Sequence, residues 1–381
     1  NKIKTNKTKA TSNKIVHNIY DNLQKKLCSK KIYLSTNIYI MRKYQIQEYL
    51  SSNNFARNSD LVFSEVLSKK EFEKLDSVDL KVVYEEKNKI CYINKNLKIR
   101  ENDIIFTNTD FMKYLFKELK KVDNLHNLKL ITQWSDQAIN KESFINKPSS
   151  ISNWYGIHVN FEHEKLHPIP LGLSGEYSDK NLTPSFFKKN EYDVSEKRNL
   201  LYINFQKNTN EAVRMNITKN FEGQDWVKID QPNLQLNEYL DEIKNSSFVL
   251  CPFGNGFDTH RLWETLYAGS IPIVLNHISY QTTDELPVLV VDDYKQLTEE
   301  YLKNTLREFS KVDYNLDKLN IDYWIKDINS IKNNSSEVST LFLSELSFQK
   351  IKFSYNLYKF INRIIKKIIF RKNQILKKIQ S

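Results

Sequence analysis

Short apolar runs alternate with longer amphipathic segments along most of the chain. In the first half these runs predict strands, and residues 110–121 between two of them show helical spacing. The predicted strands of the first half are residues 32–34, 80–83, 103–106 and 128–132. Such alternation is typical of an α/β domain. Residues 1–29 show no clear period, and we interpret them as a polar lead-in.

The alternation is more regular in the second half of the chain. Strands are predicted at residues 200–204, 226–229, 248–251, 271–275 and 288–291. Helices are predicted between them at residues 211–221, 236–244 and 259–268. Strands that are separated by helices in this way favour a parallel, doubly wound sheet.

The length of the chain indicates two domains. Its 381 residues exceed the roughly 100 to 200 residues of one ordinary domain. A proline-punctuated passage at residues 167–173 and a polar stretch up to Arg198 indicate the end of the first domain, so we place the boundary near residue 195. The predicted parts are an N-terminal domain over residues 30–195, a second domain over residues 196–335 and a C-terminal helical tail over residues 336–381.

Composition indicates a folded protein of a reducing compartment. Apolar residues make up 40% of the chain and aromatic residues 12%, which is enough for real cores. The cysteines Cys28, Cys91 and Cys251 are odd in number and widely spaced, so neither a disulfide framework nor a zinc site is indicated. No run approaches the roughly 18 apolar residues of a membrane span, and the polar start lacks a signal-peptide core. We therefore expect a cytoplasmic protein that does not span a membrane.

The net charge of +11 is concentrated at the C-terminus. Residues 350–381 contain ten lysines and arginines and no acid, so the rest of the chain carries a net charge of only +1. Apolar residues from Ile361 to Ile375 lie near a helical period between these cations, which is typical of an interfacial helix on anionic lipid at the inner membrane face. The alternative is a terminal helix that packs on the N-terminal domain with a solvated basic face. Because the tail lacks a groove-reading motif, we expect no nucleic-acid partner.

Residues 248–274 contain the pattern that is most informative about chemistry. An apolar strand ends at Pro252, a loop with Gly254 and Gly256 follows, and Asp258 or Thr259 can cap the next helix. In an open α/β sheet, ligands bind at such a strand end and helix N-terminus. The glycines would let the backbone approach a phosphate, and the free N–H groups of the first helical turn would favour its charge.

Two charged residues of the predicted helix suit a nucleotide. Arg261 lies in the first turn and can hold a diphosphate through two hydrogen bonds. Glu264 follows on the same helical face, where its carboxylate could accept both ribose hydroxyls. The alternative is that Arg261 and Glu264 form an ordinary surface pair, that Asp258 is only a helix cap and that the glycines only turn the chain.

Residues 248–274, continued by residues 284–293, resemble the C-terminal domain of exostosin-like glycosyltransferases, including ribitol xylosyltransferase-like and bacterial or viral polysaccharide-synthesis relatives. The shared progression is Pro-x-Gly from Pro252, Arg-x-x-Glu from Arg261 and Gly-x-Ile-Pro from Gly269. The resemblance also takes in residues 201–205 with Asn208 and Thr209, and more loosely residues 130–136 and 167–172.

The resemblance implies a GT-B fold, inversion at the anomeric carbon and a nucleotide-sugar donor that is bound without metal. It makes residues 30–195 the acceptor side and residues 196–335 the donor side, with a UDP-type donor and no other cofactor. The donor-binding residues that it implies are Asn204, Thr209, Asn255, Asp258, Thr259, His260, Arg261 and Glu264. The chain has no Asp-x-Asp, the arrangement that holds a divalent ion in metal-dependent enzymes of the GT-A kind, and this agrees with the resemblance.

Inversion requires a base on the acceptor side. Asp136 follows the predicted strand 128–132, so we predict that it lies at the carboxyl edge of the sheet and acts as this base. The alternative is that Asp136 only caps a following helix, and Asp110 is the rival base. Where relatives often carry His-Asn-Ser-Asp, this chain has Gln133-Trp134-Ser135-Asp136, and Trp134 could stack on an acceptor sugar or pack in the core.

Two further groups of residues are interpreted as structural. His158, His163 and His167 lie close together, but their irregular, proline-rich surroundings lack a partnering carboxylate, so we predict no metal site. Cys251 has no accompanying Cys/His/Asn pattern, and we interpret it as a buried strand residue.

Together these observations predict an inverting glycosyltransferase. It would move a sugar from a nucleotide-diphosphate sugar to a hydroxyl of a glycan, a polyol phosphate or a lipid-linked acceptor, in the synthesis of a surface polysaccharide or glycoconjugate. Two other hypotheses stay open: a non-catalytic scaffold that binds a nucleotide or a glycan, and a basic nucleic-acid-binding protein.

Overall fold

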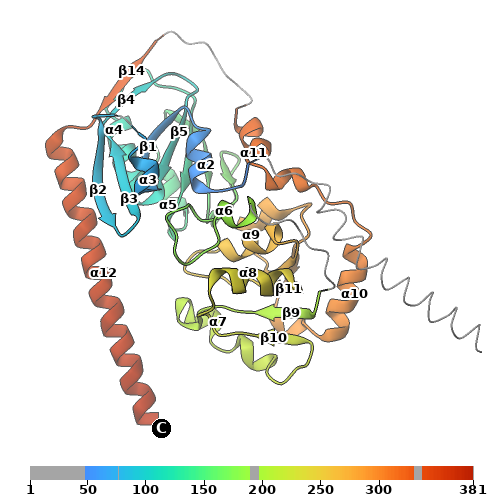
Figure 1. Ribbon diagram of the computed structural model, residues 1–381. Coiled ribbons are helices and arrows are strands. Elements are labelled where there is room, and N and C mark those ends of the chain that lie inside the picture. The colour runs from blue at the N-terminus through green and yellow to red at the C-terminus, as the bar shows by residue number, and fades with distance from the viewer. Residues whose placement is uncertain (1–47, 76, 189–196, 330–336, 381) are drawn as a thin grey trace, which may run out of the picture.

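The computed structural model describes residues 48–75, 77–188, 197–329 and 337–380, and it contains two α/β domains (Figure 1). The predicted strand 32–34, the lead-in 1–29 and the boundary near residue 195 lie outside the described residues.

A seven-stranded sheet forms the N-terminal domain, with the order β2-β3-β1-β5-β6-β7-β8. Its strands are β1 (Leu61–Ser68), β2 (Leu80–Glu86), β3 (Lys89–Asn94), β5 (Ile104–Asn108), β6 (Leu128–Gln133), β7 (Ile151–Gly156) and β8 (Leu166–Pro168). Strands β1 and β5 to β8 run parallel, and β2 and β3 form an antiparallel hairpin beside them. The strands predicted at 80–83, 103–106 and 128–132 are confirmed. The helix predicted at 110–121 is present as α4 (Met112–Leu119) after a 3-10 turn, η1 (Thr109–Phe111).

A five-stranded parallel sheet forms the second domain, with the order β10-β9-β11-β12-β13. Its strands are β9 (Asn199–Ile203), β10 (Val227–Ile229), β11 (Ser246–Leu250), β12 (Ile271–Leu275) and β13 (Leu289–Val291). The chief helices are α8 (Leu236–Lys244), α9 (His260–Tyr267) and α10 (Glu299–Phe309). The doubly wound sheet is confirmed, and its strand order reverses between β9 and β11, which is where such sheets bind ligands.

The prediction of one continuous helix over residues 211–221 is wrong. The chain forms the short helix α7 (Glu211–Arg214) and then the 3-10 helix η3 (Ile217–Asn220). Asn216, Thr218 and Asn220 lie in the second part of this stretch. Such residues are poor helix formers, because their side chains compete for backbone hydrogen bonds, so the helix does not continue.

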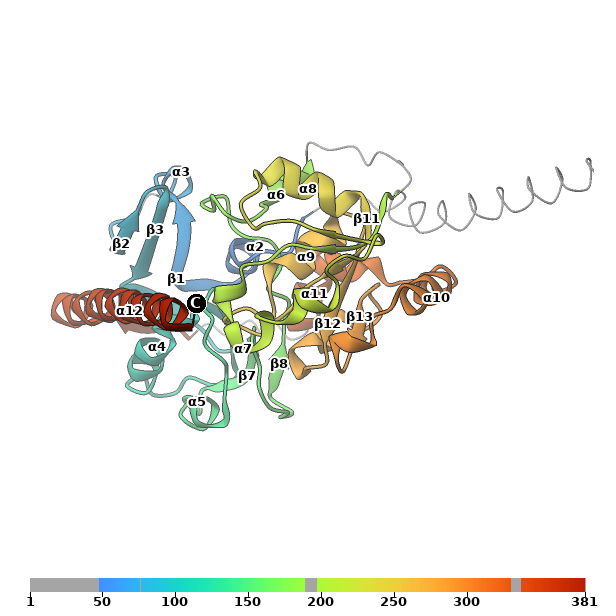
Figure 2. The same cartoon turned by 90° about the horizontal axis from the view of Figure 1, so that it is seen from below.

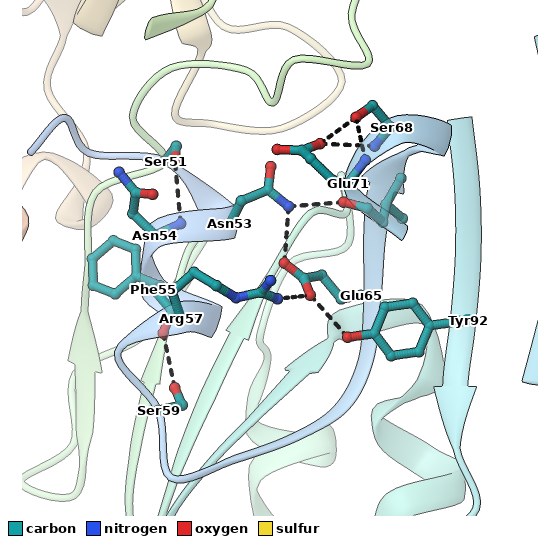
Figure 3. A network of polar contacts seen from close by, with 11 residues as sticks. Ser51, Asn53, Asn54, Phe55, Arg57, Ser59, Glu65, Ser68, Glu71 and Tyr92 are labelled. Atoms are coloured by element: carbon teal, nitrogen blue, oxygen red, sulfur yellow. Dashed lines mark hydrogen bonds and ion pairs between the residues drawn. The ribbon is translucent and has the colours of Figure 1, made fainter. Parts of the chain in front are cut away.

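Helix α2 (Ser52–Arg57) and residues 48–51 before it join the two domains. The backbone N–H of Leu50 donates to the Tyr267 hydroxyl of α9 at 2.8 Å, and Tyr49 forms a β-bridge with Asn320. Helix α2 is in turn fastened to β1 by the buried carboxylate of Glu65 (Figure 3). The partners of this carboxylate are the Asn53 amide at 2.9 Å, the Tyr92 hydroxyl at 2.9 Å and the guanidinium of Arg57.

The end of the chain returns to the N-terminal domain. Strand β14 (Ser339–Phe342) pairs with β4 (Asn96–Ile99), and helix α12 (Glu345–Gln380) follows. The first turns of α12 bury Phe348, Ile351 and Tyr355 in the N-terminal core. The helix then continues past the sheet (Figures 1 and 2). Helix α11 (Ile321–Ile328) precedes this return and lies against α2. Among the described helices, none is long and apolar enough to cross a membrane.

Candidate active site

The candidate site lies in the second domain, at the carboxyl ends of β9 and β11. The loop after β11 contains Gly254, whose N–H donates to the Gly256 carbonyl at 3.0 Å. Helix α9 begins at His260 with Thr259 as its N-cap residue, so Asp258 is not the cap. The hydroxyl of Thr259 makes no capping hydrogen bond, and its buried Oγ1 has no partner. The Thr259 hydroxyl is therefore left without a protein partner at a helix N-terminus, the kind of position that binds anions.

Arg214 is a residue of this site that sequence reasoning missed. Its buried guanidinium donates to the carbonyls of Phe253 at 2.7 Å, Pro252 at 2.9 Å and Gln206 at 3.2 Å. These hydrogen bonds connect the loop after β11 to the end of β9. Burial lowers the pKa of Arg214 to about 10, and the neighbouring charge of Arg261 acts in the same direction. No sequence signal identifies this residue, because an arginine in a short amphipathic helix is usually solvated.

Arg261 supplies a second guanidinium beside the first. It lies 5.5 Å from the centroid of the Tyr239 ring, and its Nε is buried without a partner. Within the described ranges, neither Arg214 nor Arg261 forms an ion pair with a carboxylate. Two guanidinium groups without a paired acid create a positive field at the strand ends, and this field suits an anionic ligand.

Three of the predicted donor-binding side chains make hydrogen bonds to the backbone of residues 171–182. Both carboxylate oxygens of Glu264 are occupied, Oε1 by the N–H of Leu182 at 2.9 Å and Oε2 by the Tyr239 hydroxyl at 3.0 Å. Asp258 accepts the N–H of Leu171 at 2.9 Å and the indole N–H of Trp263 at 3.0 Å.

His260 contributes the third such contact, because its Nδ1 lies 2.8 Å from the Gly172 carbonyl. Asp258, His260 and Glu264 thus fasten residues 171–182 onto α9. Glu264 is only 3% exposed, so the alternative of a surface pair with Arg261 is wrong.

The remaining predicted donor residues lie around the end of β9. Asn204 is buried and donates to the Gln231 carbonyl at 3.1 Å, and Thr209 is half-buried in η2 (Lys207–Thr209). A cavity of about 770 Å³ opens on this side, between the ends of β9 and β10. Gln206, whose carbonyl is held by Arg214, lines it together with Asn208. Its volume lies within the range of small-molecule sites.

Asp136 and Asn255 bring the two domains into contact. The Asn255 amide donates to Oδ2 of Asp136 at 3.1 Å, although 119 positions separate the two residues along the chain. Asp136 is exposed, and it follows the end of β6 as the sequence predicted. The next helix, α5 (Lys141–Ile145), is capped by Asn140, so the interpretation of Asp136 as a helix cap is wrong.

Asp110, the rival base, is enclosed beside Asp136. Its carboxylate accepts from the Ser135 hydroxyl at 2.7 Å, the Gln137 amide at 3.2 Å and the Tyr355 hydroxyl at 3.1 Å. Burial raises the pKa of Asp110, and the charge of Asp136 adds to this effect. Among the described residues, three donors hold Asp110 in place, whereas one donor contacts Asp136.

Trp134 adds an aromatic surface two residues before Asp136. It is half-buried against the N-terminal core, with a backbone φ of 66°. Bulky residues rarely adopt this left-handed conformation, which concentrates at functional sites. The ammonium group of Lys89 lies 5.2 Å from the centroid of its ring and 5.9 Å from that of Tyr177.

The three clustered histidines have separate surroundings. Nδ1 of His158 accepts the N–H of Asp258 at 3.2 Å, His163 packs on Phe144, and His167 lies 3.0 Å from the Asn153 amide oxygen. In the part of the chain that the structure describes, no group of three potential ligands could hold a metal ion. Cys251 is fully buried, as predicted, and burial raises the pKa of its thiol to about 12.

Two α/β domains with mainly parallel sheets, which contact each other at the strand-end loop of the second, form the GT-B architecture that the sequence predicted. Residues 173–298 match the family model of the exostosin GT47 domain. This match confirms the exostosin-like resemblance over these residues and supports glycosyltransferase activity.

Similar solved structures include two of α1,3-fucosyltransferase. The first has 12% identity over 55% of this chain and 68% of that chain, with a TM-score of 0.33. The second, with GDP-fucose, has 12% identity over 66% and 77%, with a TM-score of 0.28. A GtfA/B complex has 11% identity over 68% and 57%, with a TM-score of 0.29. No curated protein sequence matches the chain.

Proposed function

We propose that the enzyme transfers a sugar, with inversion and without metal, from a nucleotide-diphosphate sugar to a hydroxyl group. The acceptor would be a glycan, a polyol phosphate or a lipid-linked intermediate of surface polysaccharide or glycoconjugate synthesis, and the reaction would take place in the cytoplasm. The contact between Asp136 and Asn255 is the observation that carries the proposal, because it sets an exposed carboxylate of one domain against the phosphate-type loop of the other.

In this reaction Asp136 removes the proton from the acceptor hydroxyl. The acceptor oxygen then forms a bond to the anomeric carbon from the side opposite the diphosphate. The bond between that carbon and the diphosphate oxygen breaks, and the electron pair leaves with the diphosphate. Arg261, the field of Arg214 and the N-terminus of α9 stabilise the negative charge that develops there.

The contacts of the predicted donor residues suggest two separate roles for them. Thr259 and Arg261 each have a buried polar atom without a partner, and Asn255 lies on the loop, so these three would contact the donor. Asp258, His260 and Glu264 would act as positioning residues, because their side chains hold residues 171–182 against α9. The cavity between β9 and β10 would take the nucleoside, for which we favour uridine.

A thermal-shift experiment tests the donor site. The protein is melted with UDP, GDP, CDP or ADP, each with and without EDTA, since a ligand that binds only the folded state raises the melting temperature. We expect a shift of a few degrees with one diphosphate, unchanged by EDTA. The Arg261→Ala variant should lose the shift, and Arg307→Ala, which changes an arginine of the distant helix α10, should keep it.

The outcomes separate this proposal from its alternatives. A shift that requires a divalent ion would contradict metal-independent binding. A shift without turnover of any sugar donor would favour a non-catalytic scaffold. No shift with any of the four nucleotides would overturn the donor site.

A further inference from the structure

Helix α12 is fastened to the N-terminal domain along one side only. Beyond its buried first turns, the Tyr355 hydroxyl donates to Asp110, and Lys359 forms an ion pair with Glu86 of β2 at 2.9 Å. Arg363 contacts the same carboxylate of Glu86. The ammonium group of Lys359 also lies 3.7 Å from the centroid of the Tyr84 ring. These contacts set which face of the helix points away from the protein.

The outward face of α12 is apolar. Its large side chains are 42% to 70% exposed, although residues of these types are usually buried in helices that pack on a domain. They are Phe353, Leu357, Phe360, Ile361, Ile364 and Ile368. Apart from the adjacent Phe360 and Ile361, their spacings of three and four residues place them in one stripe along the helix. Tyr355 and Lys359, which contact the domain, lie on the opposite side of the helix, at about 100° of rotation per residue.

The charge of the same segment is of one sign. Residues 350–381 contain ten cationic side chains and no acidic one. A second copy of the helix placed on the apolar stripe would bring two such cationic segments together, and their repulsion opposes self-association. The apolar stripe needs an apolar environment, and the cations need negative charge nearby. The interface of an anionic bilayer provides both.

We infer that the apolar stripe of α12 docks on an anionic membrane surface. The helix lies in the plane of the interface, with the isoleucine and phenylalanine side chains between the lipid headgroups. The cations between and beside them contact lipid phosphates. Because Tyr355 ties the helix to Asp110, docking holds the edge of the N-terminal domain that contains Asp110 and Asp136 near the bilayer.

Vesicle co-sedimentation of the full chain tests this inference. The probes are phosphatidylcholine vesicles with and without phosphatidylglycerol. We expect binding to the anionic vesicles, weakened by salt, and none to phosphatidylcholine alone. A stripe variant, with Ile361→Ser, Ile364→Ser and Ile368→Ser, should lose roughly tenfold or more in partitioning, because three apolar side chains no longer enter the interface.

A matched variant controls for the loss of exposed apolar residues in general. Val78→Ser, Val290→Ser and Phe342→Ser change three exposed apolar residues outside the helix, and this variant should partition as the parent does. Unchanged melting temperatures show that both variants fold. Equal partitioning of the two variants overturns the inference. So does a parent that ignores anionic vesicles but forms a dimer in light scattering that the stripe variant abolishes, since a second copy would then cover the stripe.

Discussion

Two buried titratable groups, His158 and Asp258, meet where the N-terminal domain contacts the loop before α9. His158 is 2% exposed, and its Nδ1 accepts the N–H of Asp258. Burial lowers the pKa of His158 to about 4, and the nearby His260 and His277 act in the same direction. Asp258 is 4% exposed, and burial raises its pKa to about 7, although the N–H donors of Leu171 and Trp263 oppose the shift. As the pH falls, the two groups therefore change the stability of the fold in opposite directions.

Whether stability rises or falls with pH depends on whether the folded or the unfolded state binds the proton more tightly. For His158 the unfolded pKa of 6.5 exceeds the folded value, so the unfolded state takes up the proton first and stability is lost as the pH falls below 6.5. Between about pH 7.5 and about pH 5 this loss amounts to about 2 kcal/mol. For Asp258 the folded pKa exceeds the unfolded value of 3.8, so stability is gained as the pH falls through 7, by about 2 to 3 kcal/mol over the same interval. In the parent protein the two effects nearly cancel.

The Asp258→Asn variant separates the two effects. Asparagine keeps an acceptor oxygen for Leu171 and Trp263 and does not titrate, so the effect of His158 stands alone. Urea unfolding at both pH values gives the free energies of unfolding. We expect the free energy of unfolding of the variant to fall by about 2 to 3 kcal/mol more than that of the parent between about pH 7.5 and about pH 5, because the variant lacks the stabilisation that protonation of Asp258 gives the parent. All other groups titrate alike in both proteins, so equal changes in the parent and the variant would refute the reasoning.

Three further predictions concern catalysis and the joint between the domains. Arg261→Ala should lower kcat/KM about 10-fold to 100-fold in a donor-turnover assay, because a charged hydrogen-bond donor to the diphosphate is lost; an unchanged value would remove Arg261 from the site. Asp136→Asn should lower kcat by about 100-fold or more while the nucleotide thermal shift persists, and a full kcat would exclude Asp136 as the base. Gly172→Ala should destabilise the fold by more than about 2 kcal/mol, because φ is 71° and a Cβ atom would lie 2.3 Å from the Leu50 carbonyl oxygen. Thermal unfolding measures both this variant and its control Gly223→Ala, which has a φ of 78° and open space around it and should cost only about 1 kcal/mol. Equal costs would show that the contact with Leu50 does not matter.

The sequence by itself determined most elements of the second domain. Helix α8 and strand β12 have the predicted bounds, and α9 differs from its predicted range by one residue at each end. These segments have clear apolar periods and end at residues such as Asn245 and Gly269, so local physics is sufficient to place them. Strand β1 was not predicted, because Ser64 and Glu65 interrupt its apolar run, and their partners Thr107 and Tyr92 lie on other strands.

Only the tertiary structure decided how the chemically important residues are used. The sequence placed Glu264 and Asp258 beside Arg261, but whether their carboxylates face a ligand or the protein depends on residues 171–182, more than eighty positions away. The contact of Asp136 with Asn255 and the burial of Arg214 under the loop likewise depend on the path of the chain between distant segments. Local periodicity determines which segments become helices and strands. Hydrogen bonds between segments far apart in the chain form only after the sheets have packed, so no local pattern encodes them.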